Sequence, residues 1–296
     1  MKYLNQLLLP YRLLIKKILI IFGLVILALP IVIYFPNKGT TDMDIWLEWT
    51  THIVKWGPLN AYNIINTNHD YQSTDYPPLT FVNLWLALKV ASIVKVGWVI
   101  GIKIILLIYY LATLVALIYL STSNRKRSIT KSVGITTGLL LGGLLFVVNS
   151  QALSFLDITF APYLIFSLAT FSRRKYFFSG VCLALAILVK WIAILMLPAL
   201  LFYFLKKQVR QYRIDYLPLV KFLGGIGLIV GLLIASFWLN HTSLYSLVEA
   251  LRITLIRPYL SALSLNFNWI ITYLNLLLFP KMYGGLNGGS PRIIID

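Results

Sequence analysis

Long apolar segments alternate with short polar ones along most of this chain, and the longest match a membrane-spanning helix in length. We expect seven spans, at 13–35, 98–120, 133–150, 153–171, 176–189, 191–205 and 217–239, and a further apolar stretch at 263–279. A span needs about 20 residues, so the fifth and sixth are short and form a tight hairpin or two half-spanning helices. The pattern predicts an all-α polytopic membrane protein with seven or eight transmembrane helices in one domain, residues 1–296.

Two long polar segments interrupt this pattern. The first, residues 36–97, holds more than half of the nine acidic residues, and the second covers residues 240–296. Within the first segment, apolar residues recur at helical spacing over 78–95, but Lys89 and Lys95 interrupt them. We therefore expect an interfacial helix along the outer leaflet at 78–95, and not a span.

Basic residues indicate the orientation. They cluster in the N-terminal tail and in the loops at 125–131, 173–175 and 206–213, which together hold more than half of the 26 Lys and Arg residues. These clusters share one side if the N-terminus is cytoplasmic, as the positive-inside rule requires. Residues 36–97 and 240–296 are then extracytoplasmic.

Composition supports a lipid environment. The chain is 59% hydrophobic and only 12% charged, whereas soluble domains carry about 25% charged residues. Its net charge of +17 does not indicate nucleic acid as a partner, because the basic residues lie between apolar runs, where membrane topology requires them. The expected surroundings are membrane lipids. The single cysteine, Cys182, excludes an intrachain disulfide framework.

The first outer segment carries the strongest candidates for chemistry. Asp42 and Asp44 follow the first span in the sequence T-D-M-D-I-W-L-E-W, where either carboxylate could act as a general base or bind a cation. A solvated acidic loop explains them equally well. His69 and Asp70, with Asp44, could supply metal ligands, although their spacing is not diagnostic.

Two further candidates lie where polar and apolar segments meet. Asp75 and Tyr76 belong to T-D-Y-P-P-L-T, whose prolines make a rigid turn before the interfacial helix. Asp157 lies just inside the fourth span, where an ionisable group is costly. Snorkelling to the interface is the alternative explanation for Asp157.

Cationic and polar candidates complete the set. Lys190 lies at the turn of the short hairpin, where a buried ammonium needs an anion such as a lipid-linked phosphate; snorkelling to the head groups is the alternative. Arg252 and Arg257 suit phosphate, and they precede the polar and aromatic residues Asn266, Asn268 and Trp269. An ordinary amphipathic interfacial helix is the alternative for this last stretch.

Four stretches in this order resemble GT-C glycosyltransferases, which take sugars from polyprenyl-phosphate donors. Asp42 is followed by aromatic residues four and seven positions on, and D-Y-P-P-L-T at 75–80 is similar to a motif of the dolichyl-phosphate-glucose-dependent glucosyltransferases. N-S-Q…D at 149–157 with A-L-A-I-L-V-K at 184–190 resembles bacterial and archaeal members and the related mannosyltransferases. S-L-N-F-N-W at 264–269 resembles a stretch of the bacterial members. The family usually continues with several more spans, so the resemblance implies a C-terminally truncated chain.

The resemblance implies an inverting hexosyltransferase of the prokaryotic plasma membrane with an extracytoplasmic site. A mannosyl or glucosyl group would pass from a polyprenyl-phosphate donor to a lipid-linked or protein-linked glycan. Asp42 would be the catalytic base, with Asp44 as its neighbour or substitute, and Lys190, Arg252 or Arg257 would stabilise the departing phosphate. Asp75, Tyr76, Asp157, Asn266, Asn268 and Trp269 would complete the substrate site. A divalent cation is left open, since only some members use one.

Two rival hypotheses come from other classes. A transporter or lipid flippase would explain the spans, Asp157 and Lys190, but it predicts paired broken helices in two halves, and the sequence shows no such internal symmetry. It also leaves the acidic outer segment unexplained. An inactive truncated GT-C homologue or a membrane scaffold is the second rival.

Overall fold

The computed structural model describes residues 33, 35, 37–39, 42–68, 74–121, 156–211, 216–256, 278, 283–287 and 290–293. Side chains are not described at 121, 157, 205–211, 255–256 and 283–293. The expected third span at 133–150, the apolar stretch at 263–279 and nearly all of the expected first span therefore lie outside the described residues.

The regular secondary structure among the described residues is helical apart from one short hairpin. Their α-helices are α2 (Asp42–Trp56), α3 (Pro58–Thr67), α4 (Leu79–Val94), α5 (Trp98–Ser121), α7 (Ala161–Ser172), α8 (Tyr176–Val189), α9 (Met196–Gln211), α10 (Leu217–Leu239) and α11 (Tyr245–Ile256). Two 3-10 turns, η2 (Leu156–Thr159) and η3 (Trp191–Leu195), precede α7 and α9. Strands β1 (Tyr283–Asn287) and β2 (Ser290–Ile293) pair antiparallel.

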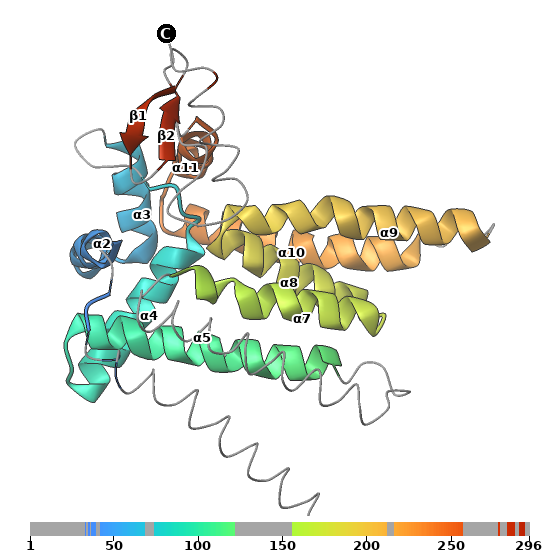
Figure 1. Ribbon diagram of the computed structural model, residues 1–296, viewed down its shortest axis with the longest axis horizontal. Coiled ribbons are helices and arrows are strands. Elements are labelled where there is room, and N and C mark those ends of the chain that lie inside the picture. Colours follow the sequence, from blue (N-terminus) through green and yellow to red (C-terminus); the bar gives the residue numbers. More distant parts are fainter. Residues whose placement is uncertain are drawn as a thin grey trace, which may run out of the picture.

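The helices form a bundle with a cap at one end (Figure 1). Helices α5, α7, α8, α9 and α10 run side by side, whereas α2, α3, α4 and α11 gather at one end, which we term the α2 end. The opposite end, which we term the Arg173 end, carries the turn 173–175 between α7 and α8. There the Arg173 guanidinium donates a 2.7 Å hydrogen bond to the carbonyl of Tyr119, near the end of α5.

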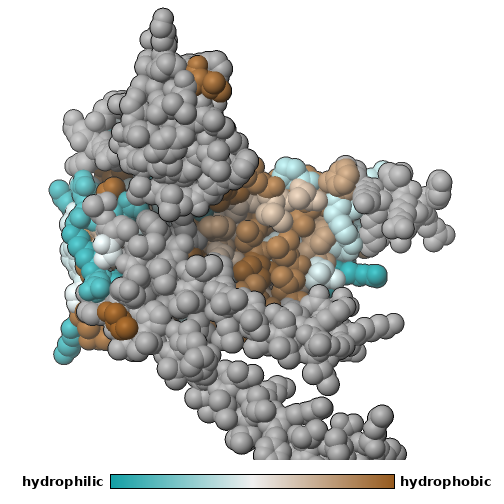
Figure 2. Space-filling view, in the orientation of Figure 1, coloured by the Kyte–Doolittle hydropathy of each residue, from teal (hydrophilic) through white to brown (hydrophobic). Residues whose placement is uncertain are grey.

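Two helices, Trp98–Leu120 and Leu217–Leu239, are long and apolar enough to cross a membrane. Each has 23 residues and therefore rises about 34 Å, slightly more than a hydrocarbon core of about 30 Å. Figure 2 shows hydrophobic residues over the visible middle of the bundle and hydrophilic residues towards both ends. Much of the apolar surface of α10 is exposed, including Leu217, Val220, Leu232 and Trp238.

Three expected spans agree closely with helices. The ranges 98–120, 176–189 and 217–239 correspond to α5, α8 and α10 within one residue. Two other ranges differ from the described helices. Within the expected span 153–171, η2 covers Leu156–Thr159 and α7 begins at Ala161, with Pro162 in its first turn, where its missing N–H costs nothing. The range 191–205 is divided into η3 and α9, which extends to Gln211.

The described part of the segment 36–97 contains α2 and α3 in addition to the expected helix at 78–95. Helix α2 forms because Met43, Trp46, Trp49 and Ile53 recur at helical spacing and are buried. The expected helix at 78–95 is present as α4, with Phe81 buried against the rest of the cap and Ile93 exposed. Its placement along a membrane surface stays a prediction.

Close backbone packing joins α8 to α10. A Cβ atom at Gly180 would collide with the carbonyl oxygen of Phe222, and one at Gly225 would collide with the carbonyl oxygen of Phe177. Only glycine permits this approach. The two helices run in the same direction, since both end at the cap. At the end of α8, the hydroxyl of Thr80 donates to the carbonyl of Val189. Just after α10, the N–H of Ser243 donates to the side chain of Asn63.

Candidate functional site

The two candidate bases lie on opposite sides of α2. Asp42 is half-buried and shares a stripe with Trp46 and Trp49, four and seven residues later, which are both buried. Asp44 points away from this stripe; its side chain is 59% exposed and pairs with the ammonium of Lys38. Both carboxylates occupy the first turn, where the helix dipole favours negative charge. The position of Asp42 facing the cap favours it over Asp44 as the residue that meets a substrate.

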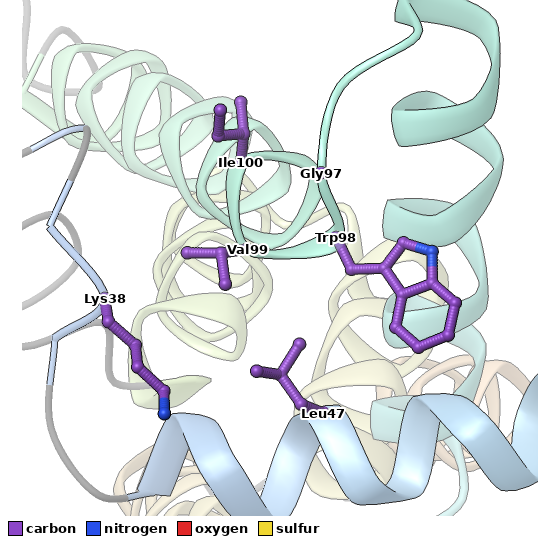
Figure 3. Close-up of a pocket in the computed structure, with 6 residues that line it drawn as sticks. All are labelled: Lys38, Leu47, Gly97, Trp98, Val99 and Ile100. Carbon is purple, nitrogen blue, oxygen red and sulfur yellow. The ribbon is translucent and has the colours of Figure 1, made fainter.

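An open hollow of about 470 Å³ lies beside this turn, between α2 and the start of α5 (Figure 3). Lys38, Leu47, Gly97, Trp98, Val99 and Ile100 line it. Its surface is apolar except at Lys38, whose ammonium is already paired with Asp44.

The turn before α4 holds Asp75 and Tyr76 in place through backbone hydrogen bonds. The N–H of Tyr76 donates to the hydroxyl of Thr74 at 3.0 Å, and the N–H of Thr74 donates to the Asn66 side chain at 3.1 Å. Thr74 is 1% exposed, so the turn is anchored inside the cap. The Tyr76 ring meets Trp49 edge-on, with 5.9 Å between ring centroids. Tyr76 is therefore fixed against the buried face of α2.

Lys190 lies in the extended break between α8 and η3. The hydroxyl of Thr80 on α4 donates a 2.9 Å hydrogen bond to the carbonyl of Val189, which fastens this break to the cap. The Lys190 ammonium lies 4.8 Å from the centroid of the Tyr76 ring, a cation–π geometry. The structure thus brings together Tyr76 and Lys190, which are far apart in the sequence.

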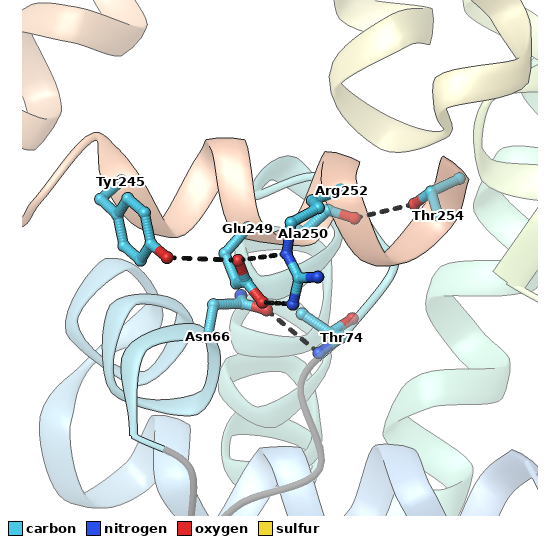
Figure 4. A network of polar contacts seen from close by, with 7 residues as sticks. All are labelled: Asn66, Thr74, Tyr245, Glu249, Ala250, Arg252 and Thr254. Atoms are coloured by element: carbon cyan, nitrogen blue, oxygen red, sulfur yellow. Dashed lines mark hydrogen bonds and ion pairs between the residues drawn. The ribbon is translucent and has the colours of Figure 1, made fainter. Parts of the chain in front are cut away.

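Helix α11 adds Arg252 to the same end (Figure 4). The hydroxyl of Thr254 lies 3.0 Å from the carbonyl oxygen of Asp75, so α11 docks on the turn that carries Tyr76. Arg252 donates to both carboxylate oxygens of Glu249, from Nε at 2.8 Å and from Nη2 at 2.5 Å. These hydrogen bonds raise the pKa of Arg252 further above its usual value.

Glu249 was missed by the motif analysis, which began at Arg252. Its side chain is 9% exposed, although it is one of only nine acidic residues in the chain. The signal that could have found it is the spacing of Glu249 and Arg252, since residues three apart are neighbours on a helix.

The described candidate residues at the α2 end lie in two places: one group surrounds Tyr76, and Asp42 lies apart from it at the start of α2. Asp75, Tyr76, Lys190 and the helix bearing Arg252 are linked by direct contacts. Asp42 lies seven residues before Trp49, about 10 Å along α2 from the residue that meets Tyr76. Asp157 lies in η2, which packs against α5, and not inside a long helix as expected. His69, Asp70, Arg257, Asn266, Asn268 and Trp269 lie outside the described residues.

The described side chains do not form the metal site that the sequence suggested. Within that part of the chain, His, Cys, Asp and Glu nowhere gather in a group of three that could hold a metal ion. The suggested ligand Asp44 is paired with Lys38.

No family model matches this chain, and no curated protein or solved structure matches it either. The likeness to GT-C glycosyltransferases therefore rests on the motif residues alone.

Proposed function

We propose that this chain is a membrane-embedded hexosyltransferase that uses a polyprenyl-phosphate sugar and acts at the α2 end of the bundle. The donor's prenyl chain would lie in the bilayer beside the apolar bundle. A lipid-linked or protein-linked glycan would be the acceptor. The α2 end would face the extracytoplasmic side, because the Arg173 end carries the basic turn 173–175.

The observation that carries this proposal is the convergence of Tyr76 and Lys190 beside α11. The two come from separate parts of the sequence, and α11 brings the guanidinium of Arg252 to the same cap. Phosphate is well bound by arginine and lysine, and arginine adds directional hydrogen bonds. Two cations at the end of an apolar bundle suit the head group of a lipid phosphate.

Asp42 supplies the other half of the proposed chemistry. Its carboxylate takes the proton of the acceptor hydroxyl while that oxygen bonds to the anomeric carbon of the sugar. The bond from this carbon to the phosphate oxygen breaks, and its electron pair leaves with the polyprenyl phosphate. Lys190 and Arg252 stabilise the negative charge on that leaving group. Attack opposite the phosphate inverts the anomeric centre.

The spacing of the two groups supports this division of roles. About 10 Å of α2 separate Asp42 from Trp49, which contacts Tyr76. We propose that the donor phosphate binds towards Lys190 and that the acceptor hydroxyl approaches Asp42. The stripe shared by Asp42, Trp46 and Trp49 gives the base a fixed direction relative to the cations.

An assay of membranes that contain the full chain tests the proposal. Polyprenyl-phosphate glucose, mannose and arabinose are supplied as separate radiolabelled donors with a lipid extract as the source of acceptor. We expect transfer from one of them, and its loss in Asp42→Asn. A chain that moves the labelled lipid across the bilayer without transferring its sugar would instead be a flippase.

A further inference from the structure

Glu249 is a buried carboxylate on α11. It lies on the face of α11 that also buries Ser246 and Ala250, and α11 packs on α3. A carboxylate withdrawn from water needs charged or hydrogen-bonding partners. Arg252 supplies two of them, one to each oxygen, and the Tyr245 hydroxyl lies 3.4 Å from the Oε2 atom.

The two hydrogen bonds from Arg252 to Glu249, which we term the fork, restrict the orientation of the guanidinium. The Arg252 side chain is 55% exposed, and a long exposed side chain ordinarily samples many rotamers. Two parallel hydrogen bonds to one carboxylate fix the plane of a guanidinium. They use two of its five N–H groups, so the remainder can donate to a second acceptor.

The Glu249–Arg252 pair lies on the helix that docks on the turn carrying Tyr76. Thr254 of α11 contacts the carbonyl of Asp75, and the next residue, Tyr76, lies under the Lys190 ammonium. Figure 4 shows the side chains of Glu249 and Arg252 extending from α11 towards Asn66 and Thr74, the residues that anchor this turn. Glu249 is therefore buried at the same end of the bundle as Lys190, where it holds the guanidinium of Arg252.

We propose that Glu249 is a positioning residue, which orients the guanidinium of Arg252 so that Arg252 and Lys190 bind the same phosphate of a prenyl-phosphate ligand. This inference rests on the proposed function, since it assigns a further residue to the same site. Glu249 itself contacts no substrate.

Removing the charge of Glu249 changes the affinity for an anion in two opposite ways. A carboxylate beside Arg252 lowers the positive potential there, so its neutralisation alone would tighten the binding of an anion. Loss of the fixed fork lets the guanidinium reorient, which weakens directional binding. If Glu249 positions Arg252, the second effect must be the larger one. Removing the charge should then weaken the binding of the anion, and tighter binding would argue against this role.

The test measures the dissociation constant of farnesyl phosphate for the full chain in detergent micelles, by intrinsic tryptophan fluorescence. Farnesol, which lacks the phosphate, is the parallel probe. We expect Glu249→Gln to bind farnesyl phosphate about tenfold more weakly, the loss of about one charged hydrogen bond, and to bind farnesol as before. A general loss of packing would affect both probes. The control is Glu48→Gln on the exposed side of α2, which should change neither.

A second variant covers the case in which Glu249→Gln fails to fold. Arg252→Lys keeps the positive charge but cannot form the fork, so it should show the same selective loss for farnesyl phosphate. If Glu249→Gln or Arg252→Lys binds this probe as well as, or better than, the unaltered chain, the positioning role is wrong.

The two proposals fail differently. Unchanged farnesyl phosphate binding in both Lys190→Met and Arg252→Gln would reject the phosphate site, and the role of Glu249 would fall with it. Weaker binding in those two variants with unaltered binding in Glu249→Gln would reject the role of Glu249 alone.

Discussion

The ammonium of Lys190 lies 4.8 Å from the centre of the Tyr76 ring, although one residue follows α8 and the other precedes α4. A cation over an aromatic ring keeps part of its charge available to an anion on its open side. The contact therefore helps to hold Lys190 at the cap.

Lys190→Met should fold normally but bind farnesyl phosphate poorly, because it keeps the length of the side chain and removes its charge. The matched control is Lys89→Met, since the Lys89 ammonium also lies over a ring, that of Trp85, at 5.5 Å. Binding is measured by tryptophan fluorescence. Equal affinity in both variants would indicate that Lys190 only snorkels to lipid head groups.

Asp42→Asn should lose activity while keeping expression and donor binding, because asparagine has nearly the same shape but cannot accept a proton. General-base loss typically lowers a rate by about 10²–10⁴-fold. Asp44→Asn should cost much less, because Asp44 is exposed and paired with Lys38. Turnover is compared in the membrane assay described above. If Asp44→Asn abolishes turnover and Asp42→Asn does not, the base is Asp44; two active variants would reject the proposed mechanism.

Gly180→Ala should destabilise the bundle, because the added Cβ collides with the carbonyl of Phe222 on α10. Overpacking of this kind costs about 1–3 kcal/mol. Gly227→Ala is the opposite case: nothing lies within 4 Å of a Cβ there, so alanine should stabilise the helix by up to about 1 kcal/mol. Thermal unfolding in detergent, followed by circular dichroism, compares the two. Equal unfolding temperatures would contradict the close packing of α8 on α10.

Tyr62→Phe should leave the protein as stable as before or more so. The ring of Tyr62 is fully buried between Phe81 and Phe237, and within the described part of the chain its hydroxyl has no hydrogen-bond partner. Burial also raises the pKa of this phenol, which keeps it neutral. Removing an unpaired buried hydroxyl relieves its desolvation cost. Tyr62→Ala should instead cost about 3–5 kcal/mol by leaving a cavity. Denaturant unfolding distinguishes these outcomes, and a large loss in Tyr62→Phe would reveal a hidden partner.

Ser172→Cys and Leu244→Cys, made separately in a Cys182→Ala background, test the proposed orientation. Ser172 is exposed at the Arg173 end and Leu244 is exposed at the α2 end. An impermeant thiol reagent added outside should label position 244 and not position 172. Labelling of position 172 from outside intact cells would reverse the topology.

The long helices could be predicted because their length and apolarity are properties of single segments. The bounds of α8 and α10 follow directly from where apolar residues begin and end, and Pro218 marks the start of α10. The start of α7 was missed for a local reason, since apolar residues precede Pro162 without being part of the helix.

The cap was harder to predict, because its helices are short and amphipathic. Trp46 and Trp49 indicated aromatic motif positions, but the packing of Trp49 against Tyr76 and Phe81 depends on contacts between distant segments. No periodicity within one segment reveals that Lys190 lies over Tyr76. The spacing of Glu249 and Arg252 indicates that they are neighbours, but the burial of Glu249 depends on the packing of α11 on α3, which no pattern within α11 reveals.

The crossing of α8 and α10 at Gly180 also bears on bilayer thickness. Gly180 meets α10 between Phe222 and Ile226. Lys190 follows Gly180 by ten residues, and α8 and α10 run in the same direction. The break at Lys190 therefore lies level with a point about five residues before the end of α10. Five residues rise about 7 Å, which places the break that far short of the end of α10. In a bilayer matched to α10, the backbone of Lys190 would lie below the head groups, and local thinning of the bilayer would bring a lipid phosphate closer to it. The thickness of the bilayer would then influence how easily a prenyl phosphate reaches Lys190. Short acyl chains in the surrounding lipid should favour its binding, and long ones should oppose it.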